Sequence, residues 1–239
     1  SSITLGLSAA TGTDVVQGAA GRAIQHGLRS AFHHVNKTGG VHRRSLQLVV
    51  KDDGHDATRT RSNVAQMVQG DNRQVFALVG IPGAAPALAA KQLAVKNRTV
   101  LFAPHTGIDS LEPDPPAPFV FNVRARYSDE ARQLTRHLLE RAKPGLAAGN
   151  IAVFAQGDDS GSLDELGQSG LAGVASALGK QGIKKSQIRV TSYAATQPTK
   201  VDTAVVELLR WISSGKRDVS SSGTIRVAVV LLALQDAAA

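Results

Sequence analysis

The side chains best suited to chemistry in this sequence are seven histidines and a few neighbouring aspartates. A helix would point the adjacent His33 and His34 apart, and although His26 and His33 would share a helical face, no third ligand accompanies them. Cysteine is absent, which excludes disulfides, thiolate metal sites and a cysteine nucleophile. We therefore predict histidines on the surface, with no metal and no cofactor.

Paired carboxylates follow two of the apolar segments. Asp52 and Asp53 come directly after one, and Asp158 and Asp159 after another, where acid–base chemistry is conceivable. Neighbouring residues of an extended chain point to opposite faces, so a carboxylate that caps or braces a turn is the favoured interpretation. An enzyme using Asp52, Asp53 or His105 stays an alternative. Because no Gly-x-Ser-x-Gly elbow and no nucleophile–base spacing occur, we predict a protein that is not an enzyme.

One glycine-rich turn could bind an anion. Residues 80–83 read Gly-Ile-Pro-Gly between a predicted strand and a predicted helix, where backbone N–H groups can point at a ligand. The turn has neither the Gly-x-Gly-x-x-Gly spacing of dinucleotide sites nor the Gly-Lys-Ser/Thr ending of a P-loop. A carboxylate cradle and an ordinary tight turn both stay open.

The elements that would position these residues alternate between strand and helix. Short apolar, β-branched segments predict strands at 3–7, 46–50, 75–79, 99–102, 151–154, 188–191 and 225–232. Helical periodicity separates most of them, with Asp56 as the predicted N-cap of the second helix. This alternation is typical of an α/β fold with mostly parallel sheets and helices on both faces.

The second half of the chain gives two further helix predictions and a boundary. Ser128 and Asp202 are each predicted to cap a helix. The apolar residues predicted to be buried by these two helices are Ala131, Leu134, Leu138, Val205, Leu208, Leu209 and Ile212. Four of the nine prolines fall within 112–118, which predicts a surface loop. We expect two lobes, 1–121 and 122–239, the second incomplete, with the native chain continuing past Ala239.

The charge balance raises the question of an anionic partner. Lys and Arg total 27 against 19 Asp and Glu, but these cations are spread along the sequence and aromatic residues make up only 4%. We predict no nucleic-acid partner. The longest apolar run, 227–234, is far shorter than the roughly 20 residues that cross a bilayer. The first strand begins almost at once, as in an exported protein whose signal peptide has been removed.

Six short motifs follow one another along the sequence in a characteristic order. They are Ile-Thr-Leu-Gly-Leu-Ser from Ile3, Val-Asn-Lys-Thr-Gly-Gly-Val-His from Val35, Leu-Val-Val-Lys-Asp-Asp-Gly from Leu48, Phe-Ala-Leu-Val-Gly from Phe76, Leu-Phe-Ala-Pro-His-Thr-Gly from Leu101 and Phe-Asn-Val-Arg-Ala-Arg-Tyr-Ser-Asp-Glu-Ala from Phe121. Together they resemble the type I periplasmic binding proteins, in particular the branched-chain amino acid receptors related to the leucine/isoleucine/valine-binding protein. The resemblance covers nearly the whole chain.

The resemblance implies a two-lobed receptor that closes around a ligand like a hinge. It implies an exported, periplasmic, monomeric protein that delivers an amino acid or related small organic acid to the ABC permease of the inner membrane. A ligand-sensing module of a signalling receptor with the same fold is the alternative. The ligand-binding residues that the resemblance implies are Gln17, Gly83, Ala84, Ala85, His105, Thr106, Gly107, Asp159 and Ser160.

Three of these positions depart from the pattern of the amino acid receptors. Ala84 stands where a Ser or Thr hydroxyl usually binds the ligand carboxylate, Gln17 where a tyrosine is frequent, and Ser160 where an aromatic residue is common. We expect a roomier and less apolar pocket than in those receptors.

Overall fold

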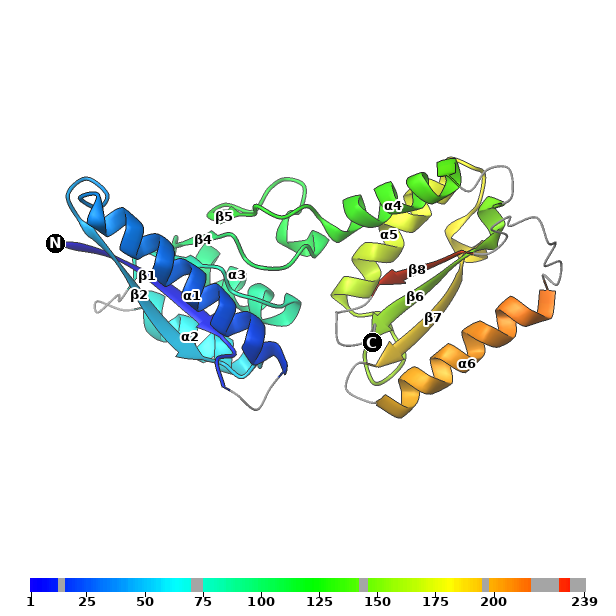
Figure 1. The fold of residues 1–239 in the computed structure, drawn as a ribbon, viewed down its shortest axis with the longest axis horizontal. Coiled ribbons are helices and arrows are strands. Elements are labelled where there is room, and N and C mark those ends of the chain that lie inside the picture. Colours follow the sequence, from blue (N-terminus) through cyan, green and yellow to red (C-terminus); the bar gives the residue numbers. More distant parts are fainter. Residues whose placement is uncertain (13–15, 70–74, 142–145, 195–197, 216–227, 233–239) are drawn as a thin grey trace. The chain divides into compact units, whose positions relative to one another are not determined.

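The computed structural model describes residues 1–12, 16–69, 75–141, 146–194, 198–215 and 228–232. The chain divides into two compact units, 1–124 and 125–239. Each unit is an α/β layer structure with its own parallel sheet (Figure 1). The predicted fold class therefore holds within each unit.

The first unit contains a five-stranded parallel sheet in the order β2-β1-β3-β4-β5. Its strands are β1 (Ser2–Ala9), β2 (Ser45–Asp52), β3 (Ala77–Val79), β4 (Val100–Phe102) and β5 (Val120–Phe121). Its helices are α1 (Val16–Lys37), α2 (Ala57–Val68), α3 (Ala84–Lys96) and the short η1 (Asp109–Leu111). The predicted loop at 112–118 is largely exposed.

One face of this sheet forms the core with α2 and α3. The strand register aligns Val49, Gly6, Leu78, Leu101 and Val120 in a single row across the five strands. The buried cluster over this row comes from both helices. A Cβ at Gly6 would lie 2.7 Å from Sδ of Met67, so the glycine lets α2 approach the sheet closely.

The opposite face carries α1, as right-handed crossovers require when the chain first moves from β1 to β2 and then back to β3 (Figure 1). The methyl groups of Ile24 and Leu28 lie over Gly80. Contacts of α1 are concentrated on β2 and β1, which leaves Phe102 and Phe121, paired on β4 and β5, exposed.

The second unit contains a three-stranded parallel sheet in the order β7-β6-β8. Its strands are β6 (Ile151–Gly157), β7 (Arg189–Ala194) and β8 (Ala228–Leu232). Its helices are α4 (Tyr127–Arg141), α5 (Glu165–Gly179), α6 (Pro198–Gly215) and the short η2 (Ala148–Asn150) and η3 (Lys185–Gln187). Residues 225–227, part of the last predicted strand, lie outside the described residues.

Helices cover both faces of the second sheet. The larger core joins α4 and α5 to the sheet, whereas α6 contacts the stacked rings of Phe154 and Tyr193, whose centroids are 5.0 Å apart. A Cβ at Gly173 of α5 would lie 2.1 Å from the carbonyl oxygen of Ser128 in α4. The two helix backbones are therefore in direct contact at this glycine.

Two of the predicted helix starts are wrong. Helix α4 begins at Tyr127 and α6 at Pro198, so Ser128 and Asp202 lie inside helices rather than at their N-caps. Some predicted core positions are wrong as well, because Leu134, Val205 and Leu209 are exposed. The buried residues of α4 are Ala131, Thr135 and Leu139, and Ala204 is buried in α6. Spacing alone did not determine which side of each helix meets the sheet.

The described residues contain neither a membrane-spanning helix nor a metal-binding cluster. None of the described helices has the length and hydropathy that spanning a membrane requires. Nor do three or more His, Cys, Asp or Glu side chains within these ranges gather in a group that could hold a metal ion.

Candidate functional site

The candidate site of the first unit lies where its parallel strands end. Because all five strands run in the same direction, the loops that follow them meet at one edge of the sheet. The loops after β1, β2, β3 and β4 supply the residues described below.

Asp52 connects the loops that follow β1 and β2. Its Oδ1 accepts hydrogen bonds from the backbone N–H of Thr11 at 3.0 Å and of Gly54 at 3.1 Å. These two N–H groups, with a smaller contribution from Arg59, hold the pKa of the Asp52 carboxyl below its usual value. The carboxylate is thus engaged in holding the loops.

Asp53 is a buried brace of the same loop, with 1% of its surface exposed. Its Oδ2 accepts hydrogen bonds from the hydroxyls of Ser8 at 2.8 Å and Thr60 at 2.9 Å, and its Oδ1 accepts from the backbone N–H of His55 at 2.9 Å. This geometry agrees with the bracing role favoured from the sequence and leaves the carboxyl inaccessible to a substrate.

His55 belongs to this edge although the sequence did not single it out. A Cβ placed on Gly83 would lie 2.3 Å from Cε1 of the His55 ring, so the imidazole rests against the glycine backbone. Gly83 has φ +91°, a conformation that side chains disfavour. Both features require glycine at position 83. No local sequence signal reports this contact, because it joins two loops distant in the chain.

The structure brings the predicted residues after β3 and β4 together. His105 donates its backbone N–H to the carbonyl of Ile81 at 2.9 Å, and its carbonyl accepts from the N–H of Gly83 at 3.4 Å. Partial burial, and secondarily the charge of Arg124, lowers the pKa of His105. The neighbouring Thr106 is buried, with 2% of its surface exposed.

Helix α3 begins at this point without a side-chain cap. Its N-cap residue is Gly83, which has no side chain to accept from the first turn. Among the described residues, the backbone N–H groups of Ala84 and Ala85 have no recorded acceptor. Uncapped N–H donors at the positive end of a helix dipole favour an anion. Gln17, the remaining candidate of this unit, lies in the first turn of α1.

The candidate loop of the second unit follows β6 and is organised by Asp158. Its Oδ1 accepts from the Ser160 hydroxyl at 2.6 Å and from the backbone N–H groups of Ser160 and Ser162 at 2.9 and 3.1 Å. The Ser160 hydroxyl is the main cause of the lowered pKa of Asp158, and the backbone N–H groups add to it. The Ser192 hydroxyl on β7 donates to the carbonyl of Gly161 at 2.9 Å. The loop is thereby fixed with Asp159 exposed.

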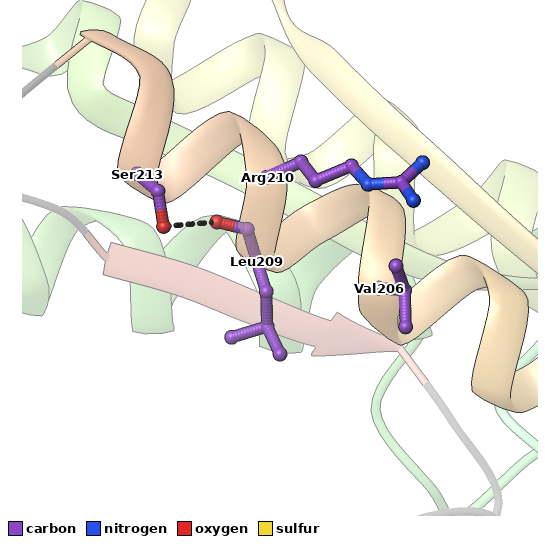
Figure 2. Close-up of a pocket in the computed structure, with 4 residues that line it drawn as sticks. All are labelled: Val206, Leu209, Arg210 and Ser213. Atoms are coloured by element: carbon purple, nitrogen blue, oxygen red, sulfur yellow. Dashed lines mark hydrogen bonds between the residues drawn. The ribbon is translucent and has the colours of Figure 1, made fainter.

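A surface hollow of about 390 Å³ lies elsewhere, on α6 (Figure 2). It is lined by Val206, Leu209, Arg210 and Ser213 of this one helix. The Ser213 hydroxyl donates to the carbonyl of Leu209 at 2.8 Å, so it is already engaged within the helix. Ligand pockets combine enclosing walls with convergent polar groups, and the hollow lacks both. We do not assign it to the ligand.

With this geometry in place, the chain can be assigned to a family. The family model described as "periplasmic binding protein" matches residues 2–208. The chain therefore belongs to the periplasmic binding proteins, and its fold is the type I fold of that family, as predicted.

Solved structures agree with this assignment. A possible leucine/isoleucine/valine-binding protein from Rhodopirellula baltica SH 1 is 24% identical, with a TM-score of 0.75 over 96% of this chain and 55% of its own. A substrate-binding periplasmic protein from Ralstonia solanacearum is 27% identical, with a TM-score of 0.67 over 87% of this chain and 53% of its own. A solute-binding ABC transporter protein from R. palustris, in complex with benzoate, is 16% identical, with a TM-score of 0.70 over 89% of this chain and 53% of its own.

The chain spans about half the length of these solved structures. No curated protein gives a significant match. The family and these neighbours are binding proteins rather than enzymes, which is the class predicted from the sequence.

Proposed function

We propose that this chain is the ligand-binding part of a periplasmic receptor that delivers a small organic acid or amino acid to an ABC permease of the inner membrane. The family assignment and the ABC transporter neighbours support the receptor class. We further propose that the protein acts as a monomer and that its two units enclose the ligand, as the resemblance to branched-chain amino acid receptors implies.

The observation that carries the ligand class is the uncapped N-terminus of α3. The N–H groups of Ala84 and Ala85 are suited to a carboxylate, and the His105 loop is hydrogen-bonded to the turn that precedes them. In the proposed complex these two N–H groups bind the carboxylate in place of the hydroxyl that Ala84 lacks. The benzoate bound by the R. palustris protein shows that one neighbour of this fold accepts an aromatic acid.

In this proposal, the loop after β6 decides whether the protein prefers an amino acid or an acid without an amino group. Asp158 fixes this loop, and Asp159, next to it, adds a carboxylate that would suit an ammonium group. Asp159→Asn should therefore weaken binding of an amino acid but leave binding of an acid without an amino group unchanged.

Calorimetry of the full chain against leucine, benzoate and succinate tests the proposal. Ala84→Pro removes one donor, yet proline is well tolerated at the first position of a helix, so the fold should persist. Loss of one charge-assisted hydrogen bond should weaken binding roughly 10- to 100-fold.

Ala57→Pro, the same change at the first position of α2, is the matched control and should bind like the unmodified protein. If the Ala84→Pro variant bound the acids with unchanged affinity, the ligand would not bind at the N-terminus of α3. Failure of all three acids to bind would contradict the proposed ligand class.

A further inference from the structure

The net positive charge of the chain is concentrated in one stretch. Residues 16–44 contain five of the 27 Lys and Arg residues and none of the 19 Asp and Glu residues. The rest of the chain holds 22 cationic against 19 acidic residues, so this stretch supplies five of the eight net charges. It also contains four of the seven histidines.

The fold exposes most of these residues along α1 and the turn that follows it. Along α1, cationic and imidazole side chains recur at intervals of three and four residues, which places them on the side away from the sheet. The turn after the helix adds three more. We define the basic face as His26, Arg29, His33, Lys37, His42, Arg43 and Arg44, all of which are exposed.

The side chains of the basic face do not stabilise the described part of the unit through polar contacts. Among the described residues, none of the seven side chains makes a recorded hydrogen bond or ion pair. Arg22 differs, because its Nη1 donates to the carbonyl oxygens of Gly12 at 2.6 Å and Thr11 at 3.2 Å, and we exclude it from the basic face. Stability of the unit therefore gives no reason for this cluster of like charges.

The turn that carries His42 and Arg43 is strained. These residues have φ +48° and +61°, and the flanking Val41 and Arg44 exchange backbone hydrogen bonds of 2.9 and 3.0 Å. A two-residue hairpin turn with two positive φ angles normally selects Asn-Gly, because larger side chains disfavour this conformation. Strain of this kind commonly marks residues kept for another purpose.

The shape of the basic face indicates the kind of partner. Its side chains extend along about 16 Å of α1, from His26 to Lys37, and on into the turn after the helix instead of converging in a pocket, which does not suit a small anion. Protein interfaces usually require apolar or aromatic anchors, whereas the large apolar residue exposed between Lys37 and Arg44 is Val41, 37% exposed. An extended anionic plane fits both observations.

We infer that the basic face binds the surface of a bilayer containing anionic phospholipids. Each cation near such a surface interacts with the lipid charge over the distance of a Debye length, and no insertion into the hydrocarbon is needed. Binding of this kind would keep the protein close to a membrane whatever solute it carries. The inference is therefore independent of the proposed ligand.

Co-sedimentation of the full chain with vesicles tests the inference. The protein should bind vesicles of phosphatidylcholine with phosphatidylglycerol, remain free with pure phosphatidylcholine, and dissociate in high salt. The triple variant Arg29→Gln, Lys37→Gln, Arg43→Gln should lower the partition coefficient roughly 100-fold, about fivefold for each charge.

The matched control removes three exposed charges from the second unit, by Lys180→Gln, Lys184→Gln and Lys185→Gln. It leaves the same net charge as the first triple variant and should retain binding within about twofold. Equal losses in the two triple variants would assign the effect to net charge and overturn the inference.

A variant of the strained turn separates binding from stability. His42→Asn with Arg43→Gly introduces the preferred turn residues, so the protein should unfold at a higher temperature while binding anionic vesicles about fivefold more weakly. Vesicle binding equal to that of the unmodified chain, salt-resistant binding to neutral vesicles, or binding to a soluble acidic protein but not to lipid would each contradict the lipid assignment.

Discussion

At the scale of single residues, neighbouring aspartates differ in role because their surroundings differ. Asp52 ends β2, is accessible to water, and holds two loops through their backbone N–H groups. Asp53, one residue further, turns inward and accepts three hydrogen bonds. The alternation of faces expected from the sequence is the physical reason for this difference.

Replacement of Asp53 should be costly. Asp53→Ala leaves the hydroxyls of Ser8 and Thr60 and the N–H of His55 without their acceptor, and we expect a loss of roughly 3 kcal/mol in the free energy of unfolding. Asp56→Ala, which removes the N-cap of α2, is the comparison and should cost about 1 kcal/mol. Urea denaturation measures both. A smaller loss for Asp53→Ala than for Asp56→Ala would contradict the bracing role.

His105 should make the protein less stable in mild acid. Its pKa in the folded chain is lowered from 6.5, so the unfolded chain takes up the proton first as the pH falls. The destabilisation is absent above about pH 7.5, appears as the pH passes through 6.5, and is complete below the lowered pKa. His105→Gln should therefore lose less stability between about pH 7.5 and 5. Equal losses of stability in the unmodified protein and the His105→Gln variant between these two pH values would refute this assignment.

At the scale of elements, β4 shows how one strand serves two environments. Leu101 points into the core formed with α2 and α3 and is fully buried, whereas Phe102 on the other face is 48% exposed. The sequence predicted the strand but could not predict this difference, because both residues are large and apolar. The difference arises from the limited extent to which α1 covers that face.

Substitutions on β4 should follow this division. Leu101→Ala creates a cavity in the core and should lower the free energy of unfolding by about 3 kcal/mol. Phe102→Thr keeps a strand-forming residue and should cost less than about 1 kcal/mol. Thermal unfolding of the two variants measures the difference. Similar losses would mean that the exposed face is covered in solution.

At the scale of the whole molecule, each unit has its own sheet and its own buried clusters. The distribution of charge also belongs to this scale. Along the sequence the cations look dispersed, which argued against a nucleic-acid partner. The helical period places four of the basic and imidazole side chains on the side of α1 away from the sheet, and the turn after the helix exposes three more.

The sequence by itself determined the α/β class, the order of strands and helices, and the family. Alternating apolar segments and ordered motifs depend only on residues near one another in the chain, so they can be recognised without a fold. The resemblance also implied that the loops holding Gly83 and His105 contribute to one site, and the structure places both loops where parallel strands end.

Only the tertiary structure decided which side of each helix is buried, as at Leu134 and Leu209, and that the His55 ring covers Gly83. It also decided that Thr106 is buried. These features depend on contacts between residues distant in the chain. Local periodicity carries no information about such contacts.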